Sequence, residues 1–169
     1  MEKKKNRWLP IFLWVIFLAA IAVIVYLSFQ NGEDAKDFCK GFIQQAAQKY
    51  YAKNDVSVEE LNQMAYLIRQ SGRVLAFWVI GILGTITIHV SFRRWNWLGK
   101  TVMAGTILLA IAFLTEKLKI YIPTRHYSQE EMKLSVMAAM TGFLMVSVIT
   151  LTINAVRGVV RLIATATHG

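Results

Sequence analysis

Charged and polar side chains that could bind an anion lie where three long apolar segments of the chain begin or end. Arg69 and Arg73 are four residues apart, so they share one face of a helix that leads into the second apolar segment. A planar guanidinium group donates two parallel hydrogen bonds to a phosphate or a carboxylate. The candidate ligand-binding residues are Arg69, Arg73, Glu116, Arg125, His126, Ser128 and Glu131.

Carboxylates in this set have more than one interpretation. Glu116 closes the third apolar segment and is a weak candidate for an acid–base catalyst. It could instead pair with Arg73 and hold two segments together, since charges near a membrane mark either a packing pair or a site. Ser128 and Glu131 precede an apolar run with the spacing of a capping box, so they could do no more than start a helix.

A capping role of the kind described for Ser128 and Glu131 does not explain Arg125. Pro123 restricts the preceding turn and presents Arg125 at a defined position. An arginine at a membrane surface binds lipid phosphate or forms a salt bridge. His126, beside it, is either an acid–base group or an exposed loop residue.

Patterns for metal binding or nucleophilic catalysis are missing from the sequence. No cluster of His, Cys and carboxylates has metal-ligand spacing, and there is no glycine-rich phosphate loop or nucleophile elbow. Cys39 is the single cysteine, which excludes a disulfide within the chain and is more typical of a packing residue. His89, within an apolar segment, is also typical of packing. We therefore expect no metal ion and no cofactor.

The elements that carry these residues are four apolar segments, each long enough to cross a bilayer core of about 30 Å as a helix. They cover about residues 8–29, 74–92, 97–115 and 134–156, in a chain of 169 residues that is 56% hydrophobic with a net charge of +9. None alternates with the period of a strand. The sequence predicts one all-α domain over 1–169, a polytopic bundle of four transmembrane helices. The first segment runs past its signal-like cleavage site, which favours an uncleaved anchor over a signal peptide.

The basic residues between the segments predict the orientation. One side carries nine Lys and Arg with one acid, and the other carries ten with nine acids, many of them in the long stretch 30–72. The compact basic side is expected to be cytoplasmic, with both termini there, in the plasma (cytoplasmic) membrane. Because the charges lie between apolar blocks and form no stripe, a nucleic-acid partner is not expected.

The stretch between the first two segments has helical periodicity. Apolar residues recur on one face from Ala35 to Tyr51, and Ser57 begins a second capping box that leads into another apolar face. We expect an external amphipathic helical hairpin over 34–70, either on the bilayer or over the bundle. Glycines within the spans, Gly81, Gly84, Gly105 and Gly142, are expected to allow close helix approach.

The chain resembles the VanZ-like family of bacterial membrane proteins over most of its length. The family motif residues that it retains are Arg69, Glu116, Pro123, Arg125, Ser128 and Gly142, with Glu131 in place of an Asp. It departs from the family pattern at Gln70, Arg73, Phe77, Thr115, Lys119 and Ser135. Arg73 stands where the family has His, and Thr115 where it has Asp. The resemblance implies a link to resistance against teicoplanin-type lipoglycopeptides.

These observations favour a binding protein of the bacterial cell envelope. Its expected partners are membrane lipids, with a lipid-linked cell-wall precursor or a lipoglycopeptide as the bound anionic molecule. An enzyme acting on lipid-linked substrates and a structural or accessory membrane subunit are the alternatives. The sequence leaves the oligomeric state open, a homo-oligomer included.

Overall fold

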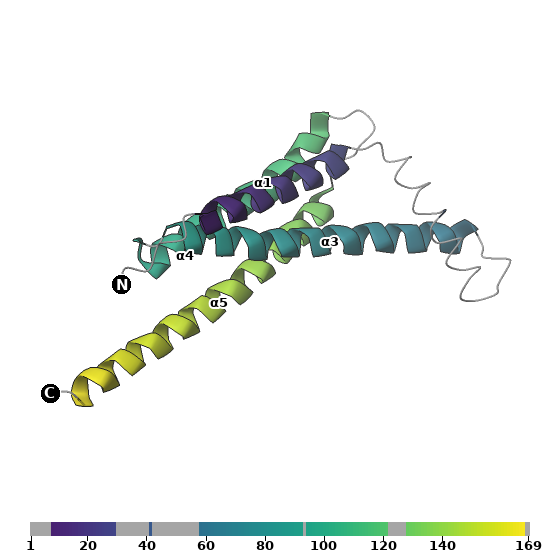
Figure 1. Ribbon diagram of the computed structural model, residues 1–169. Coiled ribbons are helices and arrows are strands. Elements are labelled where there is room, and N and C mark those ends of the chain that lie inside the picture. The colour runs from purple at the N-terminus through teal and green to yellow at the C-terminus, as the bar shows by residue number, and fades with distance from the viewer. Residues whose placement is uncertain (1–7, 30–40, 42–57, 93, 122–127, 168–169) are drawn as a thin grey trace.

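The structure is a computed structural model that describes residues 8–29, 41, 58–92, 94–121 and 128–167. Within these ranges the chain folds into helices alone, α1 (Trp8–Phe29), α3 (Val58–Ser91), α4 (Trp97–Lys117), the short 3₁₀ helix η1 (Leu118–Tyr121) and α5 (Gln129–Thr167) (Figure 1). Four of them, α1, α3, α4 and α5, are long and apolar enough to cross a membrane. This confirms the predicted helical class and the four apolar segments.

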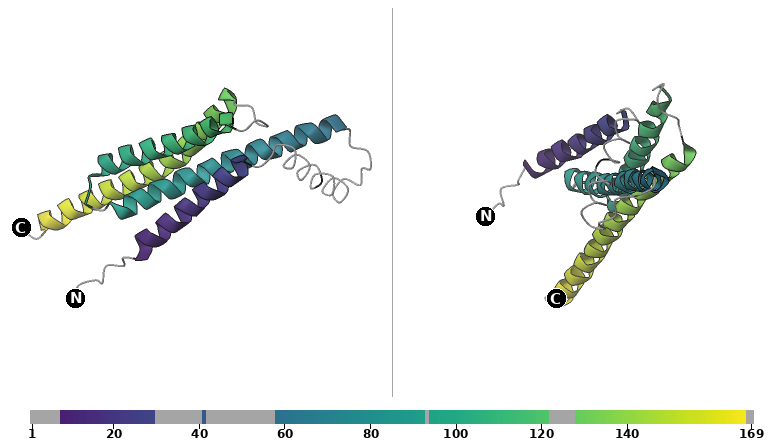
Figure 2. Two further views of the ribbon diagram at one scale, coloured as in Figure 1. Left: turned by 90° about the horizontal axis from the view of Figure 1, so that it is seen from above. Right: turned by 90° about the vertical axis from the view of Figure 1, so that its right-hand side faces the viewer.

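The helices alternate in direction along the chain, so helix starts and helix ends lie together at each end of the bundle. The start of α1, the end of α3, the start of α4 and the end of α5 lie toward one end of the bundle (Figure 2). The start of α5 lies at the other end, with the end of α4. Consequently α3 and α5 run in the same direction, and they make the most extensive contact between two helices.

Two glycines account for the close approach of α3 and α5. A Cβ added to Gly81 on α3 would collide with the backbone oxygen of Ala139, and one added to Gly142 on α5 would collide with that of Trp78. Small residues allow helix backbones to meet, which increases dispersion contacts where lipid weakens the hydrophobic driving force. The predicted role of these two glycines in packing is confirmed.

α1 is attached to the rest of the bundle mainly through α3. Its Phe17 is buried, and a Cβ added to Gly84 would lie 2.8 Å from the Phe17 ring and 2.9 Å from Leu108 of α4. The indole Nε1 of Trp14 donates a hydrogen bond of 2.9 Å to Ser91 Oγ. Most other α1 side chains face outward, as expected for a helix surrounded by lipid.

Hydroxyl groups within the helices mostly bond to their own backbone. Thr85 donates to Gly81 O at 2.6 Å and Thr87 to Leu83 O at 2.7 Å. Such bonds satisfy a buried hydroxyl without linking two helices. At the end of the bundle where α4 begins, Trp97 Nε1 donates to Thr150 Oγ1 of α5 at 3.2 Å, one of the polar links between helices.

The predicted hairpin over 34–70 is not supported. Residues 58–70, its expected second arm, are the first turns of α3 and continue into the second span without a break. Gly72 does not end α3, because a glycine inside a helix reduces helix stability by only about 1 kcal/mol relative to alanine. The expected first arm lies outside the described residues, apart from Gly41. α5 also exceeds its predicted span at both ends, extending from Gln129 to Thr167.

Candidate functional site

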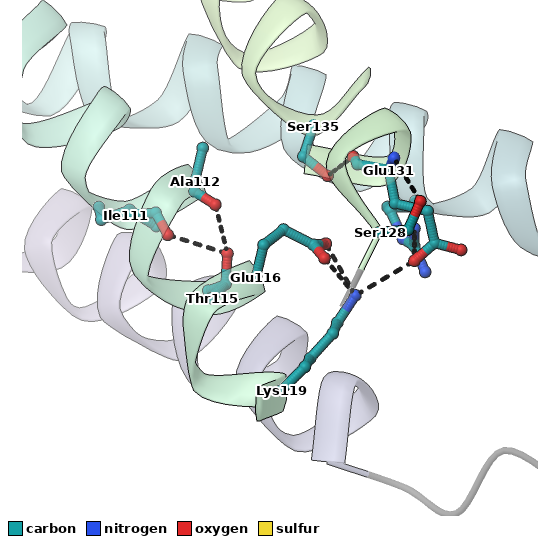
Figure 3. Close-up of polar contacts among 9 residues, drawn as sticks. Ile111, Ala112, Thr115, Glu116, Lys119, Ser128, Glu131 and Ser135 are labelled. Atoms are coloured by element: carbon teal, nitrogen blue, oxygen red, sulfur yellow. Dashed lines mark hydrogen bonds and ion pairs between the residues drawn. The ribbon is translucent and has the colours of Figure 1, made fainter. Parts of the chain in front are cut away.

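Four charged side chains meet at the end of the bundle where α4 ends and α5 begins (Figure 3). We call them the ion network. Its members come from three helices and η1, and they are Arg73, Glu116, Lys119 and Glu131. Arg73 lies midway along α3, Glu116 in the last turn of α4, Lys119 on η1 and Glu131 in the first turn of α5.

The pair formed by Glu116 and Lys119 is the buried half of the ion network. Lys119 Nζ lies 2.8 Å from Glu116 Oε1 and 2.7 Å from Oε2, so the ammonium group contacts both carboxylate oxygens. Glu116 is 1% exposed and Lys119 2% exposed. The spacing of three residues brings the two side chains to the same side of the chain as α4 tightens into η1. A charge this deep requires its partner, since an unpaired buried charge is strongly unfavourable.

Glu131 connects this buried pair to α3. Its Oε2 lies 2.6 Å from Arg73 Nη1 and 3.5 Å from Lys119 Nζ, with the Arg73 and Glu131 side chains 20% and 28% exposed. Ser128 Oγ accepts the Glu131 backbone N–H at 3.4 Å, and Ser135 Oγ donates to Glu131 O at 3.0 Å. A carboxylate in the first turn of a helix is also favoured by the helix dipole.

The charges of the ion network cancel. Two cations, Arg73 and Lys119, face two carboxylates, Glu116 and Glu131, and each carboxylate contacts at least one cation. The neighbouring Thr115 hydroxyl donates to Ile111 O and Ala112 O within α4 and contributes no charge or interhelical bond here. The ion network therefore ties α3, α4 and α5 together without leaving a net charge for a ligand.

Arg69 lies one helical turn before Arg73 on α3, outside the ion network. Its Nε is buried and has no hydrogen-bond partner among the residues that the structure describes. Buried guanidinium donors are normally bonded, because an unsatisfied donor loses its hydration without compensation. The Nε–H group of Arg69 is therefore a donor that is shielded from water and lacks an acceptor among the described residues. An anion is the acceptor best suited to a guanidinium group.

The structure brings together three of the seven predicted ligand-binding residues in one network, Arg73, Glu116 and Glu131. Among the described side chains Arg73 pairs with Glu131 and Glu116 pairs with Lys119, in place of the expected pairing of Arg73 with Glu116. The capping role of Ser128 is confirmed by its bond to the Glu131 N–H. Arg125 and His126 lie outside the described residues.

Lys119 is the member of the ion network that sequence reasoning did not select. The signal was present, because Glu116 and Lys119 have the i, i+3 spacing of an intrahelical ion pair. What the sequence does not indicate is that a lysine beyond the apolar segment turns back and becomes buried.

Metal binding finds no support in the described part of the chain, where no group of three or more His, Cys, Asp or Glu side chains is arranged to hold an ion. The comparisons add no relative, since no family model, no curated protein and no solved structure matches the chain. What the site does must therefore be inferred from its own residues.

Proposed function

We propose that the chain is an integral membrane protein of the bacterial cell envelope that binds an anionic group at its outer face. The observation that carries this proposal is the buried Nε of Arg69, which has no partner among the described residues and lies one turn from a neutral ion network. The bound group would be a lipid phosphate, the pyrophosphate of a lipid-linked cell-wall precursor, or an anionic part of a lipoglycopeptide.

The ion network supports this proposal by keeping its own cations occupied. Arg73 and Lys119 are neutralised by Glu131 and Glu116, so they provide a fixed frame for the donor of Arg69 and do not compete for the ligand. A preorganised donor loses little conformational entropy on binding. Arg125 and His126 remain proposed ligand-binding residues.

The VanZ-like assignment and the link to teicoplanin-type resistance belong to the same proposal. Its support is the retained motif residues, of which the structure describes Arg69 on α3, Glu116 on α4, and Ser128 and Gly142 at the start of and within α5, together with Glu131 in place of an Asp. The distribution of basic residues supports a cytoplasmic location of both termini, which would direct the ion network outward.

An enzymatic role for Glu116 is less well supported. Both of its oxygens contact Lys119 and the residue is almost fully buried, so it is not within reach of a substrate proton in this arrangement. A structural or accessory subunit is the second candidate function. It is favoured by the closed pairing of the ion network, which accounts for Arg73, Glu116, Lys119 and Glu131 without any ligand.

Binding by the purified chain in lipid nanodiscs tests the main proposal. Titration with fluorescent undecaprenyl pyrophosphate should saturate, and Arg69→Gln should weaken it by about tenfold or more, the loss of roughly one charge-assisted hydrogen bond. Lys133→Gln, which removes an exposed cation in the first turns of α5, is the matched control and should leave affinity unchanged. Equal affinity of Arg69→Gln and the parent chain would exclude Arg69 as the anchor.

Drug susceptibility separates the two candidate functions. If the chain binds an anionic envelope molecule, its expression in a susceptible bacterium should raise tolerance to teicoplanin. The Arg69→Gln variant should still insert into the membrane but give no increase in tolerance. If the ion network alone matters, Arg69→Gln should behave as the parent, and the exchange Glu116→Lys with Lys119→Glu should restore what either single change removes.

A further inference from the structure

The last turns of α5 extend beyond the bundle and expose both apolar and cationic side chains. Trp97 Nε1 contacts Thr150 Oγ1 at the end of the bundle where α4 begins. Residues 151–166 continue past this contact as a helix, over about 24 Å at 1.5 Å per residue, and every one of their side chains is exposed. Figure 1 shows this part of α5 leaving the other helices. We call residues 151–166 the arm.

Two faces can be distinguished on the arm. One polar residue, Thr152, lies on the same side as the valines and bonds to Val148 O of its own helix. The other four recur at spacings of three and four, which places them in one stripe along the helix. They are Asn154, Arg157, Arg161 and Thr165. On the opposite side, Val156, Val159 and Val160 are each more than half exposed. An apolar face with a cationic stripe opposite it is typical of a helix at the boundary between lipid and water.

We propose that the arm binds an anionic lipid surface, with its valine face in the boundary between headgroups and acyl chains and its arginines at the headgroup phosphates. The charge of the arm identifies this occupant. The stripe contains two arginines, and no Asp or Glu follows Glu131 in the sequence. Cationic amphipathic helices gain both apolar burial and attraction to anionic lipid.

A second copy of the chain is a less suitable occupant. Two arms packed side by side through their valine faces would cover the valines but leave all four arginines on the outer sides, without a carboxylate on either arm to pair with them. An anionic bilayer would bind the valine face and also supply phosphates to the arginines. The proposal does not depend on the anion site at Arg69, which lies toward the opposite end of α3.

Site-directed spin labelling of the full chain tests this proposal. Val159, two residues from Arg161 and therefore on the opposite side of the helix, would be replaced by Cys in a Cys39→Ser background and labelled with a nitroxide. The protein would be reconstituted in phosphatidylcholine vesicles with and without phosphatidylglycerol. Collisions of the label with oxygen, which partitions into lipid, and with a water-soluble nickel complex report where the arm lies.

The label should be in the lipid phase of the vesicles that contain phosphatidylglycerol, and molar salt should shift it toward water. Arg157→Gln and Arg161→Gln should each shift the equilibrium about fivefold toward water. Arg94→Gln, an exposed arginine in the turn between α3 and α4, is the matched control and should change nothing. The salt titration uses unaltered arginines, so the test does not rely on the variants folding.

Three outcomes would overturn the proposal. A label exposed to water in both vesicle types would show that the arm does not bind lipid. A label immersed equally in both, without response to salt, would show that anionic lipid is not what the arm recognises. A label shielded from both relaxers, with spin–spin broadening between copies, would show that a second copy covers the arm.

Discussion

Lys119 Nζ contacts both carboxylate oxygens of Glu116, at 2.8 and 2.7 Å, and both residues are almost completely buried. A pair in this position behaves differently from a surface salt bridge, because neither partner can recover its hydration when the other is removed. The stability of the end of α4 and the start of α5 therefore depends on keeping both charges or neither.

Lys119→Met tests this dependence. The substitution leaves the Glu116 carboxylate buried without its main partner and should reduce the free energy of unfolding by about 3–5 kcal/mol. Adding Glu116→Leu should recover much of the loss, because the buried charge is then gone. Lys117→Met, which removes an exposed lysine over the Phe113 ring, should cost less than about 1 kcal/mol. Denaturation in mild detergent followed by circular dichroism measures all three, and equal losses for Lys117 and Lys119 would contradict the prediction.

The crossing of α3 and α5 at Gly81 and Gly142 gives a second prediction. Gly81→Ala and Gly142→Ala each place a methyl group against backbone, which cannot move aside as a side chain would, so each should destabilise the bundle by about 1–3 kcal/mol. Gly158→Ala is the control, since nothing lies within 4 Å of its added Cβ. It should be neutral or slightly stabilising, because alanine is the better helix former. A thermal unfolding series in which all three variants melt together would refute the close approach.

Phe17 anchors α1, which leads to a third prediction. Phe17→Ala should cost about 3–5 kcal/mol, because Phe17 is buried against Gly84, whereas Phe12→Ala, at a position that is 61% exposed, should cost little. The loss should appear first as detachment of α1. A disulfide between cysteines introduced at facing positions of α1 and α3 should form more slowly in Phe17→Ala than in Phe12→Ala, and equal rates would argue against this anchor.

The fourth prediction concerns topology. α1 begins and α5 ends at the same end of the bundle, so reporters fused before Trp8 and after Thr167 should give the same result. With the proposed orientation, green fluorescent protein at either place should fluoresce and alkaline phosphatase should be inactive. A phosphatase inserted after Tyr121 should be active. Opposite results at the two ends would contradict the arrangement of four crossings.

Hydropathy alone predicted most of the fold. The first span, about 8–29, coincides with α1, and the third, about 97–115, differs from α4 by two residues at its end. The second and fourth spans were shorter than α3 and α5 because the charges at Arg73, Lys133 and Arg157 were taken as boundaries. Both helices continue past these charges, since Arg73 is paired with Glu131 and Lys133 and Arg157 lie exposed on the helix surface. Helix continuation is set by tertiary contacts that a local pattern does not contain.

The sequence predicted most of the residues that form the candidate site, but not which carboxylate pairs with which cation. Glu131 was expected near Arg73 because both flank apolar segments at the same end of the bundle. Which carboxylate pairs with which cation depends on how far the helices are rotated and shifted against one another. The glycine contacts at Gly81 and Gly142 determine that register, and no rule of spacing along one helix predicts a rotation between two.

The continuity of α3 has a mechanical consequence. Its 34 residues form a rod of about 51 Å, well above the thickness of a bilayer core of about 30 Å. α3 approaches the backbone of α5 most closely at Gly81. A force on the turns that follow Val58 would act first on the ion pair between Arg73 and Glu131, which joins α3 to α5 before the helices meet at Gly81.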